Sequence, residues 1–233
     1  MYAITEPTLF LPGTLCDERI WLPVWQHMQF SPGTRQYVPL QWANDLEQML
    51  TLTHDRIGYF DNAVHLVGYS MGGYVAALAA LESKSVASVT LIGYNPCGLS
   101  AAETSTRKAI ISAIDNGRYQ GMTRARLSSY FTPEELKNDA LTQTVMKMSN
   151  DLGGATLKHQ MMATTPREDL RKRLQRLSIP IRFICAQADS IAPADDIKTL
   201  AASMQNATYH RLENTAHMMM LTRPSECAAL IAN

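Results

Sequence analysis

The chain has 233 residues, 46% of them hydrophobic, and its 21 Lys and Arg residues balance 21 Asp and Glu residues at a sequence pI of about 7.0. This length is sufficient for one large domain with a sizeable buried core. The charge balance argues against a nucleic-acid-binding or anionic-membrane-binding surface that covers the whole protein.

Targeting and membrane signals are not found in the sequence. The N-terminal segment MYAITEPTLF has no basic region followed by an apolar one, so we expect no signal peptide. The apolar runs are far too short to cross a bilayer, so we expect no membrane partner. Four scattered cysteines lack metal-ligand spacing and predict free thiols in a cytoplasmic protein without a metal: Cys16, Cys97, Cys185 and Cys227.

Strand-like and helix-like segments alternate at both ends of the chain. Strands are predicted at residues 8–11, 35–40, 64–69, 86–92, 181–186 and 207–212. Helices are predicted at residues 44–53, 73–82, 194–204 and 224–231. Such alternation predicts an α/β fold with a mostly parallel central sheet and helices on both faces.

The middle of the chain carries only helix signals. Residues 98–176 therefore predict a helical cap inserted between two strands of a core formed by residues 1–97 and 177–233. Three start signals support it, each with Ser or Thr three residues before Glu: Ser100 to Glu103, Thr132 to Glu135 and Thr165 to Glu168.

The predicted cap is basic and rich in methionine. It has 13 Lys or Arg against eight Asp or Glu, a net charge of +5, and five of the 13 methionines. One interpretation is an ordinary helical cap with solvated basic faces. The other is a lid with a deformable apolar lining, in which Arg124 and Arg126 bind an anionic group of the substrate.

A serine lies in the turn between a predicted strand and a predicted helix. The segment Gly68-Tyr69-Ser70-Met71-Gly72 fits the pattern Gly-x-Ser-x-Gly in the strand-to-helix context of a nucleophile elbow. There the serine hydroxyl stands clear at the end of the strand, and the glycines avoid collisions. The alternative is a turn that merely contains a serine.

A nucleophilic serine needs a general base, which in turn is oriented by a carboxylate. Among six histidines, His217 follows the last predicted strand and precedes the last helix, at the same sheet edge as Ser70. Asp189 directly follows the strand at 181–186, whereas Asp195 and Asp196 stand at a helix start, where the helix dipole accounts for them. The sequence thus predicts Ser70, Asp189 and His217 as one constellation.

Four segments together resemble the α/β-hydrolase superfamily over nearly the whole chain: LFLPGTLCD, LVGYSMGG, ICAQADSIAP and ENTAHMMMLTRP. The chain is most similar to small bacterial single-domain serine hydrolases with a helical cap. The order Ser, Asp, His along the chain is the order of this fold. The resemblance implies Ser70 as nucleophile, His217 as general base and then general acid, and Asp189 as the orienting carboxylate.

The resemblance also implies an oxyanion hole made of backbone N–H groups. It places one donor at Met71 and the other at Thr14, with Leu15 as the alternative to Thr14. Two departures affect this region. Pro12-Gly13 stands where many relatives have His-Gly, and Ala216 stands where relatives usually have glycine before the histidine. The loss of that histidine side chain need not abolish the hole, since the hole uses main-chain donors. Ala216 predicts only a slight backbone adjustment, because alanine is small.

The expected activity is hydrolysis of a small-molecule carboxylic ester or thioester through an acyl-enzyme, with no cofactor. Leu15 and Met218 are candidate substrate contacts, although the methionine run at 218–220 also suits core filling. The first alternative is a carbon–carbon lyase or carbon–carbon bond hydrolase that uses the same three residues on a carboxylated substrate. The second is a non-catalytic binding protein, against which the complete set of three residues argues.

Overall fold

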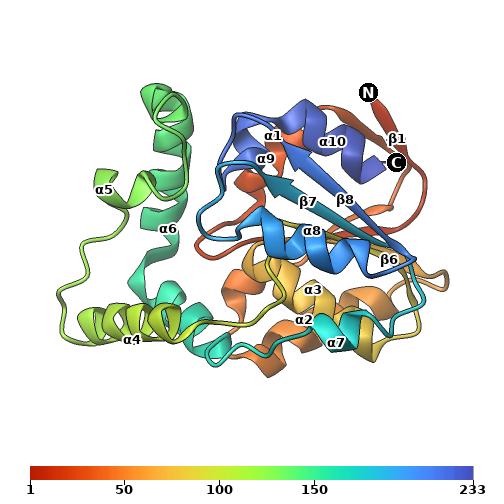
Figure 1. Ribbon diagram of the computed structural model, residues 1–233, viewed down its shortest axis with the longest axis horizontal. Coiled ribbons are helices and arrows are strands. Elements are labelled where there is room, and N and C mark those ends of the chain that lie inside the picture. The colour runs from red at the N-terminus through yellow and green to blue at the C-terminus, as the bar shows by residue number, and fades with distance from the viewer. Residues whose placement is uncertain (233) are drawn as a thin grey trace.

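Figure 1 shows the computed structural model, which describes residues 1–232. It contains a six-stranded parallel sheet with strand order β4-β2-β5-β6-β7-β8. The strands, in this order, are Arg35–Tyr37, Thr8–Leu11, Val64–Tyr69, Val86–Ile92, Ile181–Ala186 and Ala207–Leu212. Because all six run in one direction, their carboxyl ends meet at one edge, where ligands bind in such sheets. The predicted parallel α/β fold is confirmed.

Two details of the strand prediction differ from the structure. Strand β4 ends at Tyr37 rather than at Leu40, because Pro39 has no N–H to donate and a short 3-10 helix, Leu40–Trp42, follows. The strands β1 (Tyr2–Ile4) and β3 (Met28–Phe30) were not predicted. They form a separate two-stranded parallel sheet, and three residues each are too few for a recognisable alternation.

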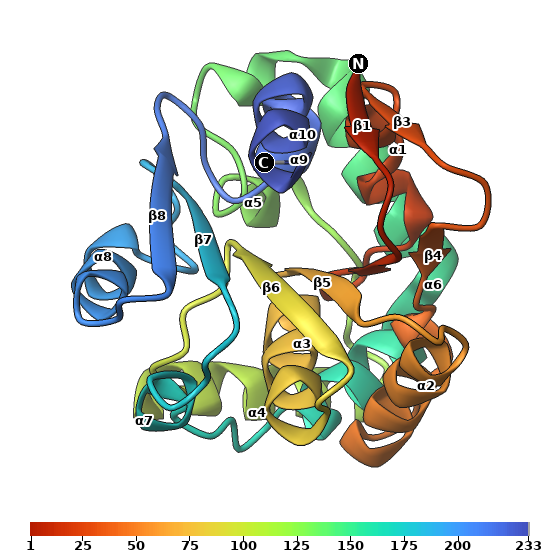
Figure 2. The same cartoon turned by 90° about the vertical axis from the view of Figure 1, so that its right-hand side faces the viewer.

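Helices cover both faces of the large sheet (Figure 2). One face packs against α2 (Leu46–Gly58), α3 (Met71–Glu82), α7 (Arg171–Leu174) and α8 (Ala194–Ala202). The other face packs against α1 (Leu22–Trp25), α9 (Met219–Thr222) and α10 (Pro224–Ala232). Helix α3 is buried on all sides over its first ten residues, which agrees with its many small side chains, mainly alanine and glycine.

The segment between β6 and β7 is largely helical, and most of it stands beside the sheet (Figure 1). It contains α4 (Ala101–Asp115), α5 (Arg124–Leu127), a 3-10 helix at Glu135–Lys137 and α6 (Asp139–Ala163). Helix α7, by contrast, packs with α3, and Leu170 and Leu174 belong to the main core. Of the five methionines in the segment between β6 and β7, Met122 and Met148 are buried in one apolar cluster with α9.

The predicted helix starts in this segment had different outcomes. Ser100 and Glu103 form a complete capping box at the start of α4. Thr132 and Glu135 exchange the same two hydrogen bonds, although only a 3-10 turn follows. The helix start at Thr165 to Glu168 is wrong. The chain there runs along residues 96–98, with the Leu170 N–H bonded to the Pro96 carbonyl, and helix α7 begins only at Arg171.

The structure also describes the thiols and the helix lengths. All four cysteines are free, and only Cys97 is partly exposed. Within residues 1–232, no helix combines the length and apolar character needed to cross a membrane. In the same range, no three His, Cys, Asp or Glu side chains are grouped so that they could hold a metal ion.

Candidate active site

Ser70 lies at the sharp turn between β5 and α3. Its backbone has φ +52° and ψ −113°, a strained conformation for a residue with a side chain. A Cβ atom on Gly68 would lie 2.4 Å from the Gly72 carbonyl oxygen, and one on Gly72 would lie 2.2 Å from the Leu11 carbonyl oxygen. Both glycines are therefore required by close backbone packing, which lifts the serine out of the sheet edge.

The structure brings His217 and Asp189 to this serine from two other loops. His217, after β8, has its Nε2 atom 3.0 Å from Ser70 Oγ and its Nδ1 atom 2.8 Å from Asp189 Oδ2. The second Asp189 oxygen accepts hydrogen bonds of 2.9 Å from the N–H groups of Ile191 and Ala192. With a proton on Nδ1, the histidine is oriented by the carboxylate and its Nε2 is free to accept the serine proton.

The loop that carries His217 is held from both sides. The Tyr69 hydroxyl donates to the His217 carbonyl at 3.0 Å, and the Met218 N–H donates to the Tyr130 carbonyl at 3.1 Å. The left-handed residue of this loop is Asn214, with φ +52°, and not Ala216. Position 216 therefore does not adopt the left-handed backbone that favours glycine, and alanine is accommodated there.

Glu135 ties the segment between β6 and β7 to the same loop. Its Oε1 accepts the Thr215 hydroxyl and its Oε2 accepts the Thr132 N–H, both at 2.7 Å. Both Glu135 and Thr215 are buried. The sequence marked Glu135 only as a helix-start residue, because its partner is 80 residues away.

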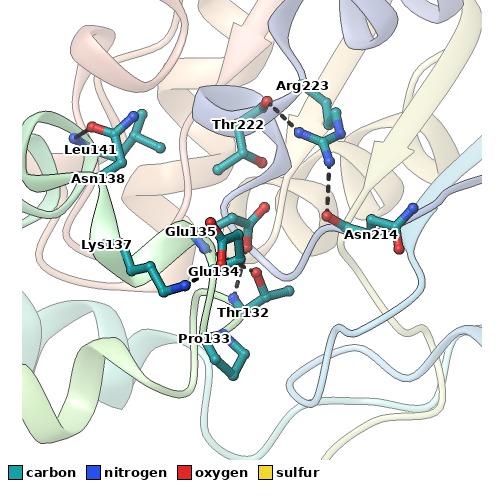
Figure 3. Close-up of a pocket in the computed structure, with 10 residues that line it drawn as sticks. All are labelled: Thr132, Pro133, Glu134, Glu135, Lys137, Asn138, Leu141, Asn214, Thr222 and Arg223. Carbon is teal, nitrogen blue, oxygen red and sulfur yellow. Dashed lines mark hydrogen bonds and ion pairs between the residues drawn. The ribbon is translucent and has the colours of Figure 1, made fainter.

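A cavity of about 830 Å³ lies where this segment meets the His217 loop (Figure 3). Polar and charged residues line most of it, including the ion-paired Glu134 and Lys137. Arg223 spans one side and donates to the carbonyls of Thr222 and Asn214. None of Ser70, Asp189 and His217 lines it, so this cavity is separate from the reacting groups.

The turn with the predicted oxyanion-hole donors, residues 12–16 and here called the oxyanion turn, follows β2 and lies against Ser70. A Cβ atom on Gly13 would lie 3.3 Å from Ser70 Cβ and 3.0 Å from the Tyr69 ring. The Leu15 N–H, at φ +50°, donates to Gln160 Oε1 at 2.9 Å and is therefore occupied. Within residues 1–232, the Thr14 and Met71 N–H groups have no hydrogen-bond acceptor. Of the three N–H groups considered from the sequence, those of Thr14 and Met71 are therefore free and that of Leu15 is not.

The four residues predicted from the sequence as weaker substrate contacts differ in their exposure to solvent. Arg124 is exposed, and Arg126 is half-buried with its guanidinium 5.1 Å from the centre of the Tyr119 ring. Leu15 is buried. Met218 is buried as well, and its sulfur accepts the Tyr69 hydroxyl at 3.4 Å.

Two other arginines of the segment between β6 and β7 were not anticipated as candidate substrate contacts. Arg107 donates to the hydroxyls of Thr164 and Thr165 at 2.8 and 3.2 Å, and burial together with Arg167 lowers the pKa of Arg107 to about 10. Arg167 lies 5.1 Å from the ring of Tyr74, one turn after Ser70 on α3. Within residues 1–232 neither forms an ion pair, and the Arg167 Nε is buried without a partner. No sequence signal distinguishes them from the other basic residues of the segment.

The parallel sheet, the strained serine turn and the Ser–His–Asp geometry define an α/β hydrolase. The alpha/beta hydrolase family profile matches residues 8–230, and the chain belongs to this family of enzymes.

The individual proteins that resemble this chain share less than a third of its sequence in the aligned regions. The chain is 28% identical over 230 residues to a 2-succinyl-6-hydroxy-2,4-cyclohexadiene-1-carboxylate synthase from Salmonella arizonae, covering 90% of this chain and 85% of that protein. A thermophilic esterase from Thermogutta terrifontis has a TM-score of 0.81 at 16% identity, over 97% of this chain and 88% of that one. A bromoperoxidase from Bacillus anthracis has a TM-score of 0.74 at 16% identity, over 99% and 92% of the two chains. These two structures share the fold with this chain.

Proposed function

We propose that the protein is a serine hydrolase that cleaves a small-molecule carboxylic ester or thioester. The observation that carries this proposal is the continuous chain from Ser70 Oγ to His217 Nε2 at 3.0 Å and from His217 Nδ1 to Asp189 Oδ2 at 2.8 Å. Such a chain is useful for activating a hydroxyl and has no evident structural purpose at a sheet edge.

The mechanism follows from these positions. Ser70 Oγ attacks the carbonyl carbon and its proton passes to His217 Nε2, while the Met71 and Thr14 N–H groups stabilise the oxyanion. The alcohol or thiol leaves with the proton from His217, and an acyl group remains on Ser70. Water then attacks the acyl-enzyme, His217 takes its proton, and the carboxylic acid is released with Ser70 restored.

The helical segment at 98–176 has a place in this proposal as a substrate cap. It contributes the Tyr130 carbonyl and Glu135 to the His217 loop and Gln160 to the oxyanion turn. The four free thiols support a reducing, cytoplasmic location.

The test is hydrolysis of p-nitrophenyl esters from acetate to decanoate by the wild type and by Ser70→Ala. We expect turnover by the wild type and a loss of at least about 10³-fold in Ser70→Ala. A fluorophosphonate should label the wild type once, at Ser70, as measured by intact mass. The control is Ser85→Ala, an exposed serine in the turn before β6, which should retain full activity. Full activity in Ser70→Ala would refute the assignment of the nucleophile.

A second candidate is a carbon–carbon lyase or carbon–carbon bond hydrolase that acts on a carboxylated substrate with the same three residues. Arg107 and Arg167 favour it, because half-buried cations without an ion-pair partner suit an anionic ligand, and Arg167 lies against Tyr74, one turn after Ser70. The relative from Salmonella arizonae, named as a carboxylate synthase, agrees with it.

This candidate is tested by ligand stabilisation. Succinate should raise the melting temperature of the wild type more than neutral succinamide does, because only a ligand that binds the folded state stabilises it. The difference should vanish in Arg107→Gln and Arg167→Gln and persist in Lys108→Gln, an exposed neighbour on α4. Equal effects of the two ligands on the wild type, with robust turnover of simple esters, would exclude the second candidate.

A further inference from the structure

The side chain of Gln160 connects α6 to the oxyanion turn, 145 residues earlier in the chain. The residue is fully buried, and its Oε1 accepts the Leu15 N–H at 2.9 Å. Its Nε2 is also buried and has no hydrogen-bond partner within residues 1–232. One half of this amide therefore forms a specific contact, while the other half is left unsatisfied.

The contact falls on a turn that needs external support. Leu15 adopts φ +50°, a conformation that residues with side chains rarely keep unless the surroundings enforce it. Within the turn the Cys16 N–H bonds to the Gly13 carbonyl at 3.2 Å, and the Cys16 thiol contacts the Thr14 carbonyl at 3.5 Å. Gln160 adds a hydrogen bond to this turn from a distant part of the chain.

Two features set the position of Gln160: an interruption of helix α6 at Gly153, and hydrogen bonds from Arg107 to Thr164 and from Thr164 to Gln160. Gly153 has φ 75° and ψ 176°, so α6 consists of two helical parts, and Gln160 lies in the second. The Thr164 hydroxyl donates to the Gln160 carbonyl at 2.8 Å, and Arg107 donates to the Thr164 hydroxyl at 2.8 Å. These contacts hold the backbone of Gln160 at the end of α6.

The chemistry of the residue points to its role. A buried apolar side chain of similar length would fill the same space without leaving a donor unsatisfied. A buried amide with one unpartnered half is therefore explained by what the other half does. Here the other half holds Leu15, the residue after Thr14, in a turn whose Gly13 packs against Ser70.

We propose that Gln160 is a positioning residue of the oxyanion hole. Its Oε1 anchors the Leu15 N–H and so keeps the neighbouring Thr14 N–H directed at the oxyanion that forms on attack by Ser70. This inference rests on the proposed serine hydrolase function. Because the anchor comes from the cap, the oxyanion hole is complete only when the cap is in place.

The experiment compares the wild type with Gln160→Met, which keeps the length of the side chain and removes the acceptor. We expect kcat for a p-nitrophenyl ester to fall by about 10- to 100-fold, less than the loss seen when an oxyanion donor is deleted outright. The KM should change less than threefold. Affinity for a trifluoromethyl ketone, which forms a tetrahedral oxyanion on Ser70, should fall in parallel with kcat. The melting temperature should stay the same or rise, because an unsatisfied buried amide is removed.

The matched control is Ser149→Ala. Ser149 is buried in the first part of the same helix, and its hydroxyl also has no partner within the described residues. Its removal should leave kcat and ketone affinity unchanged. In hydrogen exchange, the Leu15 amide should be protected in the wild type and in Ser149→Ala, and should exchange faster in Gln160→Met.

Several outcomes would overturn the inference. Unchanged kcat and ketone affinity in Gln160→Met would do so, as would a loss of stability with normal turnover per fluorophosphonate-reactive site. If the wild type itself shows no Ser70-dependent turnover, the proposed function fails. The exchange of the Leu15 amide then still decides whether Gln160 holds the turn, since unchanged protection in Gln160→Met would refute that contact.

Discussion

At the scale of single residues, His217 has two partners, Ser70 at Nε2 and Asp189 at Nδ1. Asp189 differs from the nearby acidic residues in its surroundings. It is buried, and its carboxylate accepts two backbone N–H groups as well as contacting His217. Asp195 is exposed in the first turn of α8. Burial and partners therefore separate the two carboxylates that the sequence places six residues apart.

The first prediction compares these two residues. Asp189→Asn should lower kcat by about 10⁴-fold, because an amide donor facing Nδ1 favours the wrong histidine tautomer. Asp195→Asn should leave kcat unchanged. Steady-state kinetics on the best p-nitrophenyl ester measures both, and circular dichroism checks the folding of both variants. Equal effects of the two substitutions would contradict the assignment of Asp189.

At the scale of elements, the 3-10 helix at Glu135–Lys137 joins the segment between β6 and β7 to the His217 loop. Glu135 reaches Thr215, two residues before His217, and its second oxygen holds the Thr132 N–H. The Thr215 hydroxyl is also within 2.6 Å of the Thr222 hydroxyl. The segment between β6 and β7 is thus attached beside the histidine through a buried polar network, whose members depend on each other for their hydrogen bonds.

The second prediction concerns this joint. Glu135→Gln replaces one acceptor oxygen with an amide donor, so one of the two contacts is lost inside the protein. We expect the free energy of unfolding to fall by about 1–3 kcal/mol, measured by urea denaturation. Glu134→Gln is the control, because Glu134 is exposed and pairs only with Lys137 on the surface. That substitution should change the stability little, and a similar loss in both variants would argue against the network.

At the scale of the whole molecule, the central sheet carries histidines that bear on its stability. His65 on β5 and His210 on β8 are half-buried, and burial lowers the pKa of each below its ordinary value. Arg182 on β7 lowers both further, while Glu6 partly offsets the effect on His65. At pH values just below about 6.5 the unfolded chain therefore binds more protons than the folded protein.

The third prediction follows from that sign. The stability contributed by the two neutral histidines should be complete above about pH 7 and should decline as the pH falls through the unfolded pKa of about 6.5. Calorimetric melting between pH 8 and pH 5 should show this decline, and His65→Gln should reduce it. His27→Gln, in the turn after α1, should retain it. A decline of the same size in His65→Gln would remove this histidine as its source.

Much of this protein was determined by local patterns in the sequence. All six strands of the sheet, the elbow at Ser70 and the capping box at Ser100 were predictable, because periodicity, glycines and caps act within a few residues. The convergence of Ser70, Asp189 and His217, which follow β5, β7 and β8, was predictable as well, since parallel strands bring their carboxyl ends to one edge.

Only the tertiary structure decided which distant groups meet. The Leu15 N–H is taken by Gln160, and the Thr215 hydroxyl is taken by Glu135, across 145 and 80 residues. The predicted helix start at Thr165 failed because the chain instead follows residues 96–98. Hydrogen bonds between a side chain and a remote backbone leave no spacing in the sequence, because their geometry exists only after the sheet and the cap have packed together.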